Sequence, residues 1–266
     1  MSISPEGKNK TALITGASAG IGKALAEVFA ENGFNVVLVA RRLEKLQEVA
    51  ATLERRYSVT ATCISADLAK ATAPKKLYEE ITAKNIVIDV LVNNAGYAIN
   101  EAFTETSWKQ HQDFINVMML SLTQLCYLFS KDMKSRGYGR IINVSSVAAF
   151  APEWGGSLYG AVKSYVKHFS EALDLELKPH NVYCMALCPG FTFSEFHDVM
   201  GVRGAVSKLP KWMWMDARTV AEQGYKAVMR GEVTYITGVV NKTMVTAFEL
   251  LPRKVKYLIS EKQNFL

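Results

Sequence analysis

Short apolar runs alternate with longer, more polar segments along most of the chain. The short runs are rich in β-branched residues and predict strands at 11–15, 35–40, 59–64, 88–92, 140–144, 181–187 and 234–237. Because these runs are almost continuously apolar, they favour parallel strands that are covered on both faces.

The segments between these runs predict helices at 21–32, 42–56, 72–84, 107–136, 158–178 and 217–230. Strands that alternate with helices are typical of repeated βαβ units. No linker, repeat or low-complexity stretch divides the chain. We therefore expect an α/β fold with a doubly wound parallel sheet, in three α/β/α layers and in one domain over residues 1–266.

Residues 190–216 do not follow this rhythm. They follow a predicted strand, at the position where loops of an open α/β sheet hold ligands. We expect this segment to be a substrate lid, and a pair of short core helices is the alternative. Its large apolar residues are Phe191, Phe193, Phe196, Met200, Trp212, Met213, Trp214 and Met215.

The tail, residues 240–266, predicts an amphipathic helix interrupted at Pro252. Packing of its apolar stripe against its own domain or a second subunit is the favoured interpretation, and an anionic membrane surface is the alternative. The apolar stripe comprises Met244, Phe248, Leu251, Val255 and Leu258, and the basic residues are Lys242, Arg253, Lys254, Lys256 and Lys262.

Composition narrows the classes of protein. Of the 266 residues, 49% are apolar and 21% charged, which is typical of a globular enzyme and argues against disorder. The net charge is +6, but no long basic run or nucleic-acid motif accompanies it, so we expect no nucleic-acid partner.

The compartment is predicted from the first residues and from the cysteines. The first ten residues are polar and no apolar stretch reaches 18 residues, so we expect neither a signal peptide nor a membrane span. Cys63, Cys126, Cys184 and Cys188 lie in apolar segments at spacings that do not fit zinc sites. We expect buried, reduced thiols, no metal and a cytoplasmic protein.

A glycine-rich turn, T15-G-A-S-A-G-I-G22, lies between the first predicted strand and the first helix. Gly16, Gly20 and Gly22 allow the backbone to approach a pyrophosphate, and the helix N-terminus offers free N–H groups and partial positive charge. This context predicts a dinucleotide site, whereas a lone glycine pattern could be only a tight turn.

The end of the second predicted strand carries Arg41 and Arg42. NAD-selective sites of this kind place a carboxylate there to bind the ribose 2′-hydroxyl. Two cations without a carboxylate favour a 2′-phosphate, so NADP(H) is the expected cofactor and NAD(H) the alternative.

Tyr159 and Lys163 are four residues apart on a predicted helix and so lie on one face. An adjacent ammonium lowers the pKa of a tyrosine, which could then exchange a proton with an oxygen near neutral pH. Ser146, at the end of an apolar run, can donate a hydrogen bond to developing negative charge. Ser145 is a weaker candidate because neighbouring strand residues face opposite ways.

Together these residues are similar to those of the short-chain dehydrogenase/reductase family. The resemblance runs from about Lys10 to Gly238. It is carried by the glycine turn, Asp67-Leu68, N93-N-A-G96, V144-S-S146, Y159-x3-K163 and P189-G190 with Thr192. It implies a Rossmann-like fold, a nicotinamide cofactor and a dimer or tetramer.

The resemblance also implies roles for single residues. Ser18 and Ile21 would line the pyrophosphate turn, and Arg41 would meet the adenosine phosphate. Asp67 would bind the adenine amino group, with Leu68 beside the ring. Lys163 would hold the nicotinamide ribose. The remaining implied contacts are with adenosine for Asn93, Ala95 and Gly96, and with nicotinamide for Pro189, Gly190 and Thr192.

One position departs from the family pattern. The family often has an asparagine in the middle of the helix 107–136, where it supports a proton path through water. Alignment of the helix end puts Met118 there, and Asn116 lies about 200° around the helix. Three outcomes are open: a register shift that brings Asn116 in, another proton route, or weak activity. We expect Met118 at the site with catalysis retained.

The sequence therefore predicts an NADPH-dependent reductase of a ketone or aldehyde with a fairly hydrophobic substrate. The alternatives are an NAD-linked alcohol dehydrogenase and a cofactor-sensing binding protein with little turnover. A small molecule and a second copy of the chain, in a homodimer or homotetramer, are the expected partners. Weak contact of the tail with a membrane surface is left open.

Overall fold

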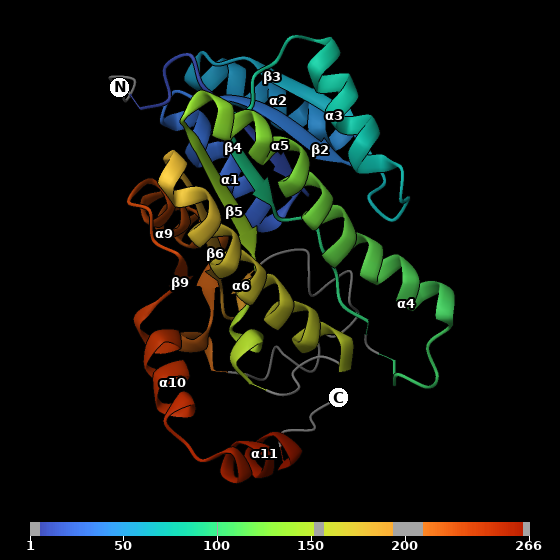
Figure 1. Cartoon of the computed structure of the whole chain (residues 1–266), viewed down its shortest axis with the longest axis vertical. Coiled ribbons are helices and arrows are strands. Elements are labelled where there is room, and N and C mark those ends of the chain that lie inside the picture. Colours follow the sequence, from blue (N-terminus) through green and yellow to red (C-terminus); the bar gives the residue numbers. More distant parts are fainter. Residues whose placement is uncertain (1–5, 100, 152–156, 194–209, 263–266) are drawn as a thin grey trace.

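In the computed structural model, seven parallel strands form one sheet at the centre of the molecule (Figure 1). The structure describes residues 6–99, 101–151, 157–193 and 210–262. The strand order is β3-β2-β1-β4-β5-β6-β9. The strands are β1 (Thr11–Thr15), β2 (Asn35–Ala40), β3 (Ala61–Ser65), β4 (Val90–Asn93), β5 (Gly139–Val144), β6 (Val182–Cys188) and β9 (Thr234–Ile236).

Helices cover both faces of this sheet. On one face, α1 (Gly20–Glu31), α2 (Leu43–Tyr57) and α9 (Ala217–Met229) pack over strand residues such as Ile14. On the other, α3 (Ala73–Ala83), α4 (Trp108–Ile115), α5 (Leu122–Arg136) and α6 (Ser157–Leu177) pack over residues such as Leu13. Since neighbouring residues of one strand enter opposite cores, the strands are apolar throughout. This confirms the three-layer, Rossmann-like α/β fold.

The predicted elements agree with the structure within two residues at each boundary. The exception is the helix expected over 107–136. A π-helical turn, η1 (Asn116–Ser121), separates α4 from α5. A second small sheet, β7 (Thr192–Phe193) with β8 (Met215–Asp216), also escaped prediction. It joins the two ends of the expected lid, whose middle, 194–209, lies outside the described residues.

The helical run Trp108–Arg136 is long and apolar enough, by length and composition, to cross a membrane. Its apolar side packs into the core instead: Phe114, Leu125 and Phe129 are each at most 3% exposed. The composition of this run is therefore that of a core helix.

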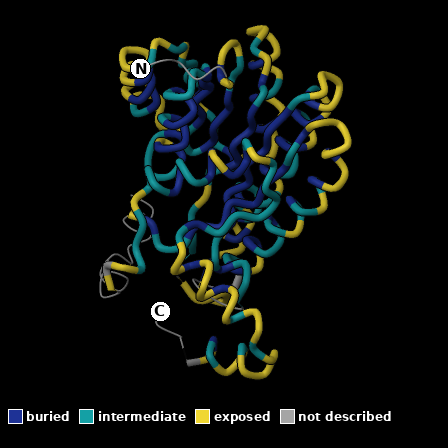
Figure 2. The backbone as a smooth tube through the Cα atoms, turned by 90° about the vertical axis from the view of Figure 1, so that its left-hand side faces the viewer, coloured by how far each residue is buried: buried dark blue, intermediate teal, exposed yellow. Residues whose placement is uncertain are grey.

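The tail forms α10 (Val239–Glu249) and α11 (Arg253–Lys262), which extend away from the sheet (Figures 1 and 2). Packing of its apolar stripe against its own domain is wrong for Met244, Val255 and Leu258, which are 41%, 38% and 55% exposed. Asn241 and Val245, on another side of α10, are buried. The exposed stripe leaves a second subunit or a membrane surface as the partner to be tested.

Candidate active site

The expected site motifs follow the carboxyl ends of β1, β3, β4, β5 and β6, which meet at one edge of the parallel sheet. Strand order reverses between β1 and β4, because β2 lies on one side of β1 and β4 on the other. In open α/β sheets, ligands bind in the crevice at such a reversal. The fold therefore brings the glycine turn and the expected catalytic residues to one place.

The glycine turn connects β1 to α1 in a conformation that requires glycine. Gly16 and Gly20 have φ of 67° and 54°. At Gly22, a Cβ would lie 2.3 Å from both Asn94 Nδ2 and Gly16 O. The residue before helix α1, Ala19, has no side chain that could cap the helix, and no side chain of the described residues does so. The first N–H groups of α1 therefore point toward the glycine turn. This geometry suits a pyrophosphate.

Two residues that sequence reasoning missed hold this turn. Asn94 Nδ2 donates to the carbonyl oxygens of Thr15 and Gly16, at 2.9 and 3.3 Å. The hydroxyl of Thr15 accepts from the N–H groups of Asn94 and Ala95, at 3.0 and 3.1 Å. Asn94 lies inside the N93-N-A-G96 motif, so the sequence pointed to this position. The motif did not show that the Asn94 side chain points to the glycine turn.

Both arginines after β2 lie near the predicted adenosine side. Arg42 Nη2 donates to Ser18 Oγ in the glycine turn at 3.5 Å, so Arg42, which was not among the predicted contacts, also reaches it. Arg41 is exposed. Burial raises the pKa of Tyr97; the charges of Asp113 and Asp67 add to this rise, and that of Arg41 acts against it. Arg41 and Asp67 therefore both lie close to Tyr97.

The loop after β3 carries Asp67 and Leu68. Asp67 Oδ1 accepts from the N–H of Ala69 at 3.2 Å, which fixes the orientation of the carboxylate. Leu68 is 7% exposed. Asn116 and Ser121, of the π turn, donate to this loop: Asn116 Nδ2 to Ala69 O at 2.9 Å, and Ser121 Oγ to Leu68 O at 2.8 Å.

The side chain of Asn93 faces the core rather than the crevice. Its Nδ2 donates to Asn143 Oδ1 at 2.9 Å, and Asn143 in turn donates to Ser170 Oγ on α6 at 2.9 Å. The expectation that Asn93 lines the adenosine side therefore holds at most for its backbone. Ala95 and Gly96, which follow β4, continue into the crevice edge.

Ser146, Tyr159 and Lys163 come together at the end of β5. Ser146 caps the short helix η2 (Val147–Phe150), accepting from Ala148 N at 3.1 Å, and hydrogen-bonds Tyr159. Lys163 Nζ lies 5.5 Å from the centroid of the Tyr159 ring. The hydroxyl of the weaker candidate, Ser145, donates to the backbone carbonyl Lys163 O at 2.7 Å.

The pKa of Tyr159 departs in the direction opposite to the expected one. Although the residue keeps some exposed surface, desolvation raises the pKa of Tyr159 to about 12, and the hydrogen bond with Ser146 only partly opposes this. Burial also lowers the pKa of Lys163 to about 8. Lys163 Nζ donates to Val144 O at 2.8 Å. The predicted lowering of the Tyr159 pKa is therefore wrong for this structure, because desolvation outweighs the hydrogen bond with Ser146.

Met118 packs against Gly96 after β4, whereas the Asn116 amide points to the loop after β3. Met118 is 3% exposed, and a Cβ on Gly96 would lie 2.6 Å from its Sδ. The helix register does shift, through the π turn, yet the Asn116 amide binds the loop after β3. Of the three open outcomes, the register shift that brings Asn116 into the site is excluded.

The segment after β6 closes the edge. The carbonyl oxygen of Pro189 accepts from Val147 N at 3.0 Å, which ties this segment to the turn after Ser146. Thr192 Oγ1 donates to Gly190 O at 3.0 Å. A Cβ on Gly190 would lie 2.5 Å from the Asn241 amide, so Asn241 of α10, another residue that sequence reasoning missed, supports this segment.

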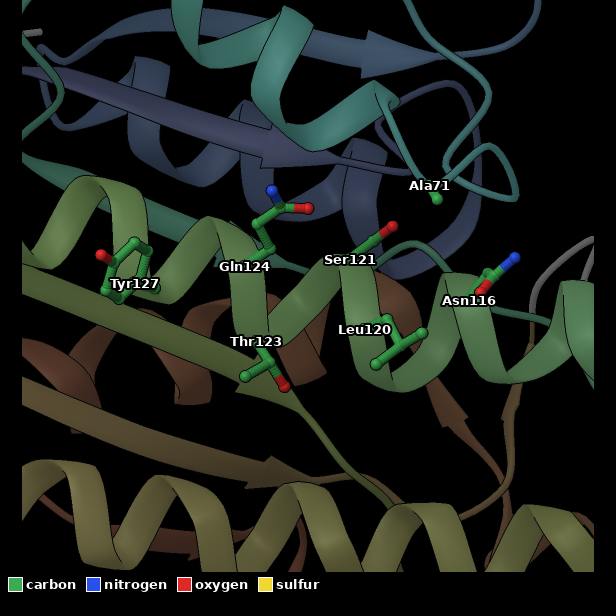
Figure 3. Close-up of a pocket in the computed structure, with 7 residues that line it drawn as sticks. All are labelled: Ala71, Asn116, Leu120, Ser121, Thr123, Gln124 and Tyr127. Atoms are coloured by element: carbon green, nitrogen blue, oxygen red, sulfur yellow. The ribbon is translucent and has the colours of Figure 1, made fainter.

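A pocket of about 460 Å³ lies along η1 and α5 (Figure 3). Its lining residues include Leu120, Thr123 and Tyr127 but none of the three predicted catalytic residues. The pocket therefore lies apart from the cluster of Ser146, Tyr159 and Lys163, although Asn116 and Ser121 line it.

Comparison with known proteins decides the family. A model described as short chain dehydrogenase matches residues 10–200. The chain belongs to the short-chain dehydrogenase family. The matched range contains the glycine turn, the Tyr159 and Lys163 pair, and the segment that begins at Pro189.

Individual relatives agree with this membership. The chain is 35% identical over 182 residues to the hydroxysteroid dehydrogenase-like protein 1 of Gallus gallus, covering 67% of this chain and 54% of that protein. It is 34% identical over 194 residues to the very-long-chain 3-oxoacyl-CoA reductase-B of Danio rerio, covering 71% and 62%. The chain thus spans little more than half the length of these two relatives.

A solved structure matches almost end to end. The short-chain dehydrogenase from Sphingobium yanoikuyae, determined in complex with NADPH, is 30% identical with a TM-score of 0.81. The match covers 92% of this chain and 96% of that one.

Proposed function

We propose that the protein is an NADP(H)-dependent oxidoreductase that reduces a ketone or aldehyde carbonyl of a fairly hydrophobic substrate. The observation that carries the proposal is the meeting of Ser146, Tyr159 and Lys163 beside the glycine turn, at the reversal of strand order. The family membership and the NADPH complex of the Sphingobium relative support the cofactor.

The residues of the chain divide the chemistry as follows. The chemistry that NADPH would supply when bound is a hydride for the carbonyl carbon. Tyr159 donates a proton to the carbonyl oxygen; with a pKa of about 12, its hydroxyl is protonated at neutral pH. Ser146 donates a hydrogen bond to the same oxygen as negative charge develops on it. Lys163 would hold the nicotinamide ribose, and its positive charge would stabilise the phenolate left behind.

The cofactor preference follows from the cations after β2. Arg41 is exposed at the predicted adenosine side, and Arg42 reaches Ser18 of the glycine turn. A 2′-phosphate between such guanidinium groups gains charge-assisted hydrogen bonds that a 2′-hydroxyl cannot make to the same degree. An NADH preference in kcat/KM would remove this part of the proposal and favour an NAD-linked alcohol dehydrogenase.

The hydrophobic substrate is proposed from the segment after β6. Phe191 and Phe193 pack on Trp214 with ring centroids 5.5 and 4.8 Å apart, and Phe193 is 55% exposed. Apolar walls of this kind bury apolar ligands. The names of the two curated relatives, a hydroxysteroid dehydrogenase-like protein and a very-long-chain acyl-CoA reductase, point to bulky apolar substrates. A lid over 190–216 stays part of this proposal.

The test is a panel of steroid, retinoid, acyl and quinone carbonyls, followed by NADPH absorbance. We expect turnover with at least one apolar carbonyl and its loss in Tyr159→Phe. Turnover that survives this substitution would contradict the assigned proton donor.

A cofactor-sensing protein with little turnover is the second candidate, because Met118 stands where the family often has asparagine. NADPH binding without turnover on any carbonyl of the panel would favour this candidate. Retention of Ser146, Tyr159 and Lys163 in one cluster favours the enzyme, since binding alone requires no proton donor.

Two surfaces are proposed for partners other than the substrate. The exposed Leu120 and Tyr127 on η1 and α5 suit a second copy of the chain, in a dimer or tetramer. The exposed Leu250, at the end of α10, and Leu258, on α11 with nearby Lys254, suit weak contact with an anionic membrane. Light scattering of the protein in solution tests the self-association.

Sedimentation with anionic vesicles tests the membrane contact, with Leu250→Glu and Leu258→Glu as variants. The cytoplasmic location stays a prediction from the sequence.

A further inference from the structure

Two side chains of the π turn η1 donate hydrogen bonds to one loop across the crevice edge. Asn116 Nδ2 lies 2.9 Å from Ala69 O, and Ser121 Oγ lies 2.8 Å from Leu68 O. Figure 3 shows both side chains pointing to the side of the helix where Ala71 lies. Ser121 is 3% exposed, so its hydrogen bond is shielded from water, where an unpaired carbonyl would be costly.

The π geometry is what allows both contacts. In an unbroken α-helix, residues five apart lie about 140° from each other around the axis, so they cannot serve the same loop. A π-helical turn closes hydrogen bonds between residues five apart and so brings such positions onto one side. Asn116 and Ser121 are the first and last residues of this turn.

The loop that they hold is fixed at its other contacts too. Asp67 Oδ1 accepts from Ala69 N, and Ala66 N donates to Ala40 O at the end of β2 at 3.1 Å. The carboxylate of Asp67 is thus placed between the strand that leads to Arg41 and the π turn. Loss of either π-turn donor would free one carbonyl of the loop and loosen the carboxylate.

We propose that Asn116 and Ser121 are positioning residues for the adenosine end of NADP(H), acting through the Leu68 and Ala69 carbonyls on the Asp67 loop. This rests on the proposed function, because it assumes that the crevice binds the dinucleotide. The π turn then has two tasks: it supports the adenosine loop on one side and presses Met118 against Gly96 on the other. The asparagine of this helix serves cofactor binding rather than proton transfer.

The experiment separates the two halves of the cofactor. Adenosine 2′,5′-bisphosphate probes the adenosine end by calorimetry, and reduced nicotinamide mononucleotide probes the reaction end by turnover. Asn116→Ala, Ser121→Ala and the double variant are compared with Asn116→Gln, which keeps the amide donor. Thr123→Val is the matched control, because Thr123 donates within its own helix to Met119 O and contacts Tyr165.

We expect each alanine variant to weaken the bisphosphate and NADPH by about 3- to 10-fold, the effect of one lost hydrogen bond. The double variant weakens them further. Turnover at saturating NADPH and turnover with the mononucleotide stay within about 2-fold of wild type, since the reaction end is untouched. Asn116→Gln recovers most of the affinity, and Thr123→Val matches wild type.

Unchanged bisphosphate affinity in a folded double variant would overturn the inference. So would an equal loss of turnover with the mononucleotide, which would mean that the turn supports the whole site. The proposed function fails separately: if the variants lose affinity for the bisphosphate and NADPH as expected but wild type reduces no carbonyl, only the reductase assignment falls. If wild type binds neither NADPH nor the bisphosphate, both fall.

Discussion

The two ends of the proposed cofactor site are built from different interactions. At the adenosine end, Arg41 is exposed and Asp67 lies on a loop fixed by hydrogen bonds to its backbone. At the reaction end, Lys163 is 7% exposed and desolvation shifts the pKa of both Lys163 and Tyr159. The first end recognises charge in contact with water, and the second controls protons away from it.

This difference predicts which measurement each end controls. Substitutions at the adenosine end should change affinity and cofactor selectivity, with an effect that salt weakens. Substitutions at the reaction end should change the rate and its dependence on pH. The following variants test this division, in order of decreasing effect.

Replacement of the proton donor should have the largest effect. Tyr159→Phe removes the hydroxyl while keeping the ring, so we expect kcat to fall by about 10²- to 10⁴-fold. The Kd for NADPH, measured by fluorescence titration, should stay within about 2-fold, because recognition lies mainly at the other end. A large loss of NADPH affinity would break the comparison between the two ends.

Removal of both guanidinium groups should change selectivity without changing the chemistry. For Arg41→Ala with Arg42→Ala, we expect the ratio of kcat/KM for NADPH over NADH to fall by about 10- to 100-fold, the value of charge-assisted hydrogen bonds. The kcat with NADH should stay at the wild-type value, because the reaction end is unchanged. Steady-state kinetics at low and high salt provide the measurement, and an unchanged ratio would place the phosphate elsewhere.

The buried lysine should make stability depend on pH. Its folded pKa, about 8, lies below the ordinary value of 10.5, so between these values the unfolded chain binds a proton that the folded chain does not. The contribution of Lys163 to the free energy of unfolding is therefore lowest below pH 8 and rises as the pH approaches 10.5. Relative to Lys163→Met, the free energy of unfolding should gain on the order of 1–3 kcal/mol between pH 7.5 and 9.5. Urea titrations at a series of pH values measure this difference. An equal pH dependence in wild type and Lys163→Met would contradict the lowered pKa of Lys163.

The smallest effect is expected at the position that departs from the family pattern. Met118 packs on Gly96, and the other residues that handle the proton are all present, so Met118→Asn should change kcat/KM by less than about 3-fold. Its pH-rate profile should match that of wild type. A clear gain in rate would show that wild type lacks an efficient proton path.

The sequence predicted the sheet, the glycine turn and the clustering of Ser146, Tyr159 and Lys163, because each depends on local pattern or on helical spacing. It could not predict the π turn, since nothing in the 107–136 periodicity marks residues 116–121. Helical spacing did place Asn116 away from Met118, but it did not show that the Asn116 amide binds the loop after β3.

The sign of the pKa shift at Tyr159 was also out of reach. Spacing on α6 places Lys163 beside the tyrosine, but only the packed structure shows the desolvation that raises the pKa of Tyr159. The direction of Asn93 was likewise missed, because its partner Asn143 lies 50 residues away on β5. The apolar stripe of the tail is exposed because of how α10 packs, and the sequence pattern does not show which face of α10 packs on the domain.

One measurement tests the central claim directly: the fate of a deuterium at the reducing carbon of NADPH. With the best carbonyl of the panel, mass spectrometry should find the deuterium on the former carbonyl carbon of the product, and Tyr159→Phe should bind NADPH yet form almost no labelled product. Deuterium lost to the solvent, or labelled product formed equally well without the Tyr159 hydroxyl, would contradict the account.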